Sequence, residues 1–67
     1  MFRYDVDLHF KNDGWDTYTV KADCIANARY NAMKRVEEEI NTDIAGTVDC
    51  IRIYPENSDI LLREYNI

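Results

Sequence analysis

The chain is poor in the residues that mark several specialised classes of protein: its 67 residues include two glycines, one proline and two cysteines. Two cysteines are too few for a disulfide scaffold, so we expect Cys24 and Cys50 to be reduced thiols with a structural role. The longest apolar runs are only a few residues long, which excludes a membrane-spanning helix. The segment Met1–Asp5 does not have the character of a signal peptide, and we therefore expect a cytoplasmic protein.

Basic residues are also scarce: eight lysines and arginines stand against thirteen acidic residues, for a net charge of -5. A chain of this charge repels phosphate groups, which disfavours direct binding to nucleic acid or to an anionic membrane. The length is close to the lower limit at which one apolar core is stable without metal or disulfide support. We expect a single domain over residues 1–67, with no cofactor and no room for a cofactor-sized cleft.

An amphipathic pattern predicts a helix from Cys24 to Ile40, with Asp23 as its N-cap. The apolar positions recur at helical spacing and form one stripe, made of Ile25, Ala28, Ala32, Val36 and Ile40 with Met33 at its margin. The two alanines in the middle of this stripe allow the helix to lie close to a sheet. Glu37, Glu38 and Glu39 fall at the end where the helix dipole disfavours negative charge, so this run does not stabilise the helix.

Strict alternation of apolar and polar residues predicts a strand over Phe2–Phe10, with the even-numbered side chains in the core. The next four residues, 11–14, have the composition of a turn, and Gly14 can take the positive φ of a hairpin loop. A second strand follows over Trp15–Ala22. The two strands are expected to pair as an antiparallel hairpin.

The parity of the apolar residues restricts how these strands pair, because both apolar sets must face the helix. We expect the register that places Leu8 beside Tyr18. The same register places Asp5 beside Lys21 on the other face, so that opposite charges meet across the strands.

After the helix, residues 41–46 read as a loop, and Thr47–Tyr54 is rich in β-branched residues and predicts a third strand. Residues 55–59 have the composition of a turn, and Ile60–Tyr65 is then a fourth strand that returns antiparallel to the third. A short terminal helix that begins at Ser58 is the alternative, because Ile60–Leu62 shows no alternation.

These elements make an α+β fold of the type ββαββ. A right-handed helical crossover from the second strand to the third leaves the first strand between them, which gives a four-stranded antiparallel sheet in the order 2-1-3-4. We expect the helix to cover one face, with Ile51 and Ile53 in the core and Ile44 tucked beneath the helix end. The other face of the sheet is expected to be open.

Few residues point to catalysis or to metal binding. Asp5, Asp7 and His9 share one strand face and could approach a divalent ion, but an open sheet face is ordinarily polar and no second histidine converges on them. Cys24 at the helix start could be a nucleophile, yet the only histidine lies at the far end of the first strand. We therefore expect no catalytic residues, no metal site and no enzymatic activity.

Two surfaces are candidates for partner binding. On the open sheet face, the apolar side chains expected to point outward are Trp15, Tyr54, Val48, Cys50 and part of Ile60–Leu62, beside the carboxylates of Asp5 and Asp7. The second surface is acidic: Glu37, Glu38, Glu39 and Asp43 cluster at the helix end, and Asp13 and Asp16 lie at the hairpin loop. Acidic clusters can imitate a phosphate array and occupy a basic groove, although most charge runs are solvated faces.

The layout resembles small proteins of phages and mobile elements. The residues that carry the resemblance are Tyr18–Thr19–Val20–Lys21–Ala22, then Ala28 and Ala32, then Gly46–Thr47–Val48 leading into Ile51 and Ile53. Some anti-CRISPR inhibitors with a helix on a short antiparallel sheet are similar, as are plasmid accessory proteins of the DpnD/PcfM type. The resemblance implies stoichiometric binding to a host defence component, without catalysis, and it assigns no binding residues.

The sequence thus predicts a non-enzymatic, acidic protein-binding module. Its expected partner is a host protein, such as a nucleic-acid-handling defence complex, and its expected action is to occlude a surface of that partner. A self-associating structural or accessory protein, active as a homodimer, is the alternative.

Overall fold

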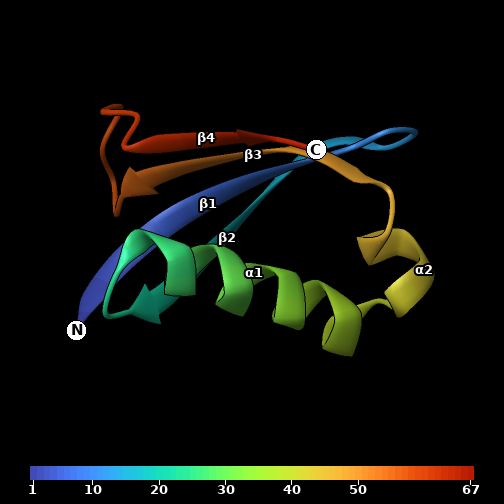
Figure 1. Cartoon of the computed structure of the whole chain (residues 1–67), viewed down its shortest axis with the longest axis horizontal. Coiled ribbons are helices and arrows are strands. Elements are labelled where there is room, and N and C mark those ends of the chain that lie inside the picture. The colour runs from blue at the N-terminus through green and yellow to red at the C-terminus, as the bar shows by residue number, and fades with distance from the viewer.

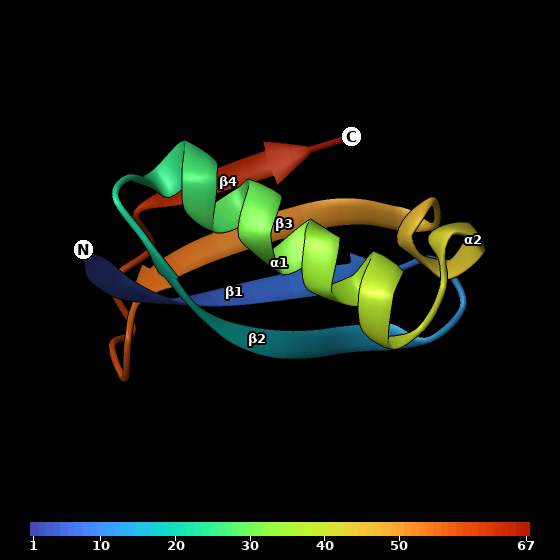
Figure 2. The same cartoon turned by 90° about the horizontal axis from the view of Figure 1, so that it is seen from below.

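A computed structural model describes residues 1–67 and shows a four-stranded antiparallel sheet with one long helix on one face (Figure 1). In chain order the elements are β1 (Phe2–Phe10), β2 (Gly14–Ala22), α1 (Ile25–Glu39), α2 (Thr42–Ala45), β3 (Val48–Pro55) and β4 (Arg63–Asn66). The strand order is β2-β1-β3-β4, which confirms the predicted topology. Helix α1 crosses the sheet diagonally, and α2 lies beyond its C-terminal end (Figure 2).

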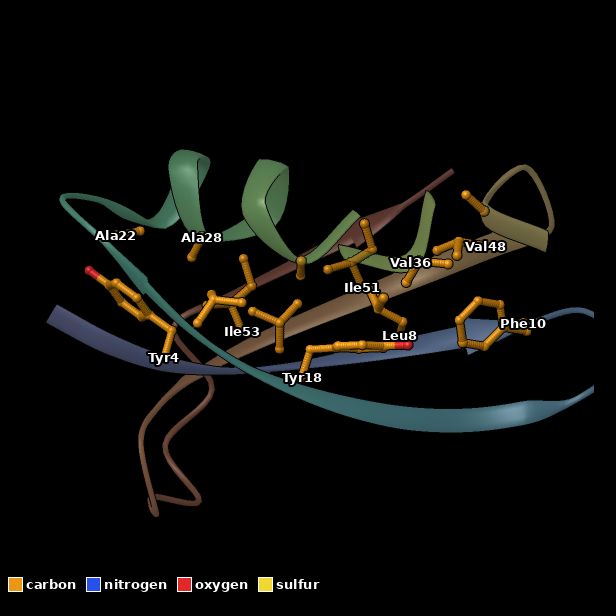
Figure 3. Close-up of a cluster of buried hydrophobic side chains, with 14 residues drawn as sticks. Tyr4, Leu8, Phe10, Tyr18, Ala22, Ala28, Val36, Val48, Ile51 and Ile53 are labelled. Atoms are coloured by element: carbon orange, nitrogen blue, oxygen red, sulfur yellow. The ribbon is translucent and has the colours of Figure 1, made fainter. Parts of the chain in front are cut away.

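The core lies between α1 and the sheet, and all fourteen buried residues are apolar or tyrosine (Figure 3). Ala28, Ala32 and Val36 of α1 are fully buried, as expected for the helical stripe. They face fully buried side chains of the two central strands, Val6, Leu8, Ile51 and Ile53. The even parity of β1 and the choice of Ile51 and Ile53 for the core are therefore confirmed.

Both ends of the predicted helix need correction. The helix begins at Ile25, and the N-cap is Cys24 rather than Asp23; no side chain makes a capping hydrogen bond there. At the other end Ile40 leaves helical geometry at φ -116° and is 49% exposed, because the chain turns toward α2 before this residue reaches the sheet. The apolar stripe therefore ends at Val36.

The register of the first hairpin is also different from the prediction. Val6 rather than Leu8 pairs with Tyr18, and Asp5 pairs with Thr19 rather than with Lys21. The cause is a tighter turn, in which the Asp13 amide donates to the Phe10 carbonyl at 3.2 Å and Gly14, at φ 81°, already belongs to β2. A shift by two residues preserves parity, so the faces are right although the charge pairing is wrong.

The second half of the chain contains three further differences. The predicted loop 41–46 includes the short helix α2, which the Asn41 side chain caps by accepting from the Ile44 amide at 2.7 Å. The fourth strand begins at Arg63, not Ile60, and neither strand nor helix forms over Ser58–Leu62. Ile44 packs against the core as predicted.

Phe2, at the first position of β1, was expected in the core and is 64% exposed. It pairs with Ala22 at the end of the sheet where β2 leaves for the helix. The centroid of its ring lies 6.4 Å from that of the Tyr4 ring. The helix layer covers little of the Phe2 side chain.

Candidate functional site

The sheet face opposite α1 carries a polar layer that no helix covers (Figure 1). The strand residues whose side chains interact on this face are Asp5, Asp7 and His9 of β1, Trp15, Thr17 and Thr19 of β2, Arg52 of β3 and Glu64 of β4. The connection between β3 and β4 projects beyond the sheet on the same side (Figure 3). The first candidate surface lies between this connection and the sheet.

Asp5 is an internal hydrogen-bond acceptor that holds this connection to the sheet. Its Oδ1 accepts from the Thr19 hydroxyl at 2.8 Å, and its Oδ2 accepts from the Asn57 amide at 2.9 Å. Asn57 lies in the left-handed region at φ 58°, which places its amide against the carboxylate. Both Asp5 oxygens are therefore occupied by the chain itself.

A shallow depression of about 400 Å³ lies beside Asp5, lined by Asp5, Asp7, Thr17, Tyr54, Ser58 and Asp59. The Asp7 Oδ1 accepts from the Thr17 hydroxyl at 2.7 Å. None of the three carboxylates that line the depression, those of Asp5, Asp7 and Asp59, forms an ion pair. No group of three or more His, Cys, Asp or Glu side chains is arranged to hold a metal ion.

A second cluster on the open face joins four elements through aromatic and charged side chains. The His9 Nδ1 lies 2.6 Å from the Asp49 Oδ1, and the His9 ring lies 4.9 Å from the Trp15 ring. The Arg52 guanidinium lies 4.7 Å above the Trp15 ring and donates to Glu64 at 2.7 Å. This hydrogen bond lowers the pKa of Glu64 and raises the pKa of Arg52.

Two of the acidic residues predicted as a second surface, Asp13 and Asp16, line an apolar groove at one end of the molecule. The groove has a volume of about 280 Å³ and is lined by Phe10, Asp13, Trp15, Asp16, Ile40 and Ile44. It lies where the β1–β2 turn approaches the C-terminal end of α1 and the start of α2 (Figure 2). Trp15 and Ile40 are each about half exposed there, at 48% and 49%. We call this surface the acidic groove, because the carboxylates of Asp13 and Asp16 lie beside its apolar floor.

Asp16 of the acidic groove and Glu39 at the end of α1 are far apart in the sequence but affect the same side chain, that of Tyr18. Burial raises the pKa of Tyr18 above its ordinary value, and the negative charges of Asp16 and Glu39 raise it further. Carboxylates from β2 and from the helix end therefore act on one side chain. Glu39 is paired with Arg35 at 2.8 Å. Glu37, Glu38, Asp13 and Asp43 make no side-chain hydrogen bond or ion pair.

The structure thus divides the predicted binding residues between two surfaces. Asp5, Asp7 and Tyr54 lie in the depression on the open face. Glu37, Glu38, Glu39 and Asp43 lie on α1 and α2, on the helix side of the sheet. Trp15 belongs to both, because its ring contacts His9 in a tilted arrangement on the open face and also lines the acidic groove.

One prediction about the open face, that for Val48, is wrong, and two features were missed. Val48 is buried at 5% exposure and does not point outward, whereas Cys50 is half-buried. The contact of His9 with Asp49 was missed, since it depends on a register shift in the pairing of β1 with β3. The apolar floor of the acidic groove was missed too, because Ile40, the last residue of the helical stripe, was assigned to the core.

Comparisons of the chain with protein-family models, with curated proteins and with solved structures found no match. The resemblance to phage and plasmid accessory proteins therefore stays a prediction from the pattern of residues. Neither helix has the length and apolar character needed to cross a bilayer.

Proposed function

We propose that this chain is a non-enzymatic binding protein that uses the acidic groove to occupy a basic surface on another protein. The observation that supports the proposal is the combination of half-exposed apolar side chains, Trp15 and Ile40, with two carboxylates: that of Asp13 has no hydrogen-bond or ion-pair partner, and that of Asp16 accepts only from the Thr17 amide. An apolar anchor supplies affinity when it is desolvated, and unpaired charges around it select a partner of opposite sign. The groove therefore suits a basic segment that carries an apolar side chain.

Basic segments with exposed apolar residues are common on proteins that handle nucleic acids, where lysines and arginines neutralise phosphates. The carboxylates of Asp13 and Asp16 in the acidic groove present negative charge much as a phosphate backbone does. We therefore propose a host nucleic-acid-handling protein as the partner, with this chain encoded by a phage or mobile element and acting by occlusion. The open face is the weaker candidate, since the chain itself occupies both oxygens of Asp5 and one of Asp7.

Affinity capture with charge variants tests this proposal. The variant Asp13→Asn/Asp16→Asn removes two charges at the acidic groove, and Asp23→Asn/Glu56→Gln removes two elsewhere on the surface and serves as the matched control. We expect the first variant to lose capture of the partner at low salt while the control retains it. The purified partner should release a fluorescent oligonucleotide when the wild-type chain is added.

Two outcomes would count against the proposal. If both variants capture the partner as well as the wild type does, the acidic groove is not the binding surface. If the oligonucleotide stays bound to a partner saturated with this chain, occlusion of a nucleic-acid site is wrong. The change of Glu37, Glu38 and Glu39 to Gln measures how far the charged surface extends along α1.

A further inference from the structure

The two edges of the sheet differ in how their backbone groups are satisfied. At the β2 edge, the Asn31 side chain donates to the Lys21 carbonyl at 2.9 Å, and the Arg35 side chain donates to the Thr19 carbonyl at 2.9 Å. Helix α1 therefore covers the C-terminal half of this edge, at Thr19 and Lys21, with two side chains one turn apart. Covered edges do not accept another strand.

The β4 edge has no such cover. The Ile67 amide donates to the Asp49 carbonyl at 3.0 Å, so the odd-numbered residues of β4 direct their backbone groups toward β3. By alternation, the amides and carbonyls of Glu64 and Asn66 point away from the sheet. An uncovered edge of this kind is a template for pairing with another strand.

The surroundings of this edge favour association. Of the nine exposed large apolar side chains, four lie in residues 60–67: Ile60, Leu61, Leu62 and Ile67. The same segment carries one Arg and one Glu, so its side chains have no net charge although the whole chain has a net charge of -5. The charge repulsion that opposes association of two copies of this acidic chain is therefore weak along β4.

We propose that β4 pairs antiparallel with β4 of a second copy of this chain, which joins two sheets into one of eight strands. This inference goes beyond the proposed function, because it concerns a different edge of the molecule. The favoured register is the one that pairs the most residues of β4 without placing like charges opposite each other. It places Glu64 opposite the partner's Asn66 and Tyr65 opposite the partner's Tyr65, with Arg63 beside the partner's Ile67.

The neighbouring registers are less favourable: one centred on Asn66 pairs fewer residues, and those centred on Glu64 or Arg63 bring like charges together. A slide that centres the pair on Glu64 sets two carboxylates opposite each other, and one that centres it on Arg63 opposes two guanidiniums. In the favoured register the carboxylate of Glu64 keeps its bond from Arg52 through Oε1. Its Oε2 accepts only a long 3.4 Å bond from Asn66 of the same chain and can take the amide of the partner's Asn66 instead.

The covered β2 edge limits the size of the assembly. Because the pairing uses the same strand of both copies, it is two-fold symmetric and closes as a dimer. The interface is short, and interfaces of small area associate weakly. The dimer should therefore depend on protein concentration.

Sedimentation equilibrium over about 10 µM to 1 mM tests the inference, with amide chemical shifts recorded over the same range. We expect a monomer–dimer equilibrium in which shifts are concentrated at Leu61–Ile67. Asn66→Glu should weaken the dimer about fivefold to tenfold, because both symmetric pairs become carboxylate pairs, and Asn66→Lys should strengthen it. Asn27→Glu, with the same charge change on α1, is the matched control.

A third variant, Asn66→Pro, removes an outward amide that the β3–β4 ladder does not use, and it should abolish the dimer. The amide spectrum of each variant shows whether it is folded, and the two charge variants carry the test if Asn66→Pro is not. A monomer at all concentrations overturns the inference. So does a dimer that Asn66→Glu and Asn66→Lys change equally, or shifts that arise only on adding a different protein.

Discussion

Replacing Asp5 with alanine should destabilise the protein by about 2 kcal/mol, because hydrogen bonds to a charged acceptor are worth roughly 1.5–3 kcal/mol each and solvent exposure reduces that value. The carboxylate accepts from Thr19 and from the Asn57 amide, at 2.8 and 2.9 Å. Losing the second bond releases the connection between β3 and β4. For a domain of this size, 2 kcal/mol lowers Tm by roughly 8–16 °C.

Urea and thermal unfolding followed by circular dichroism measure this effect. Asp7→Ala is the matched control, since Asp7 accepts one side-chain hydrogen bond and holds no loop; it should cost about 1 kcal/mol or less. A double-mutant cycle of Asp5→Ala with Thr19→Val separates the strand contribution from that of the loop. Equal costs for Asp5→Ala and Asp7→Ala, or no coupling between Asp5 and Thr19, would refute the structural role of Asp5.

Three further predictions concern the core, the pH dependence and the covered edge. Ala32→Leu overpacks the fully buried contact of α1 with the sheet and should cost about 1–3 kcal/mol in urea unfolding, whereas Ala26→Leu on the exposed side should stay within about 0.5 kcal/mol. The raised pKa of Tyr18 means that its contribution to stability is present below pH 10 and lost as pH rises further, so Tyr18→Phe should flatten the alkaline fall in Tm. Asn31→Ala/Arg35→Ala uncovers the β2 edge and should produce assemblies larger than a dimer in sedimentation velocity, unless these two side chains do not protect that edge.

The faces of the sheet could be predicted from the sequence, whereas the register could not. Alternation in Phe2–Phe10 determines which side chains point to the core, and the tighter turn preserves that result because it moves the pairing by two residues. The register depends on the backbone of residues 11–14, where several turn geometries suit the same composition. The expected pairing of the opposite charges of Asp5 and Lys21 therefore did not identify the correct register.

The candidate site was predictable only where its residues are neighbours in sequence. The run Glu37–Glu39 was visible at once, but the acidic groove needs β1, β2, α1 and α2 to meet, and Ile40 was assigned to the core. The pair of His9 with Asp49 depends on a register shift between His9 and Phe10, which no local pattern signals. The local composition of the sequence thus shows where charged residues lie, whereas the tertiary contacts determine which of them have no hydrogen-bond or ion-pair partner.

The placement of the two proposed interfaces makes them compatible. The acidic groove includes Trp15 of β2, and the proposed dimer uses β4, which is the opposite edge of the sheet. A dimer through β4 therefore leaves both grooves exposed, and it should bind two partner molecules with an affinity gain if these are linked or clustered. Asn66→Glu should then weaken capture of a clustered partner while binding to a single partner molecule is unchanged. Equal loss in both formats would show that the two surfaces overlap.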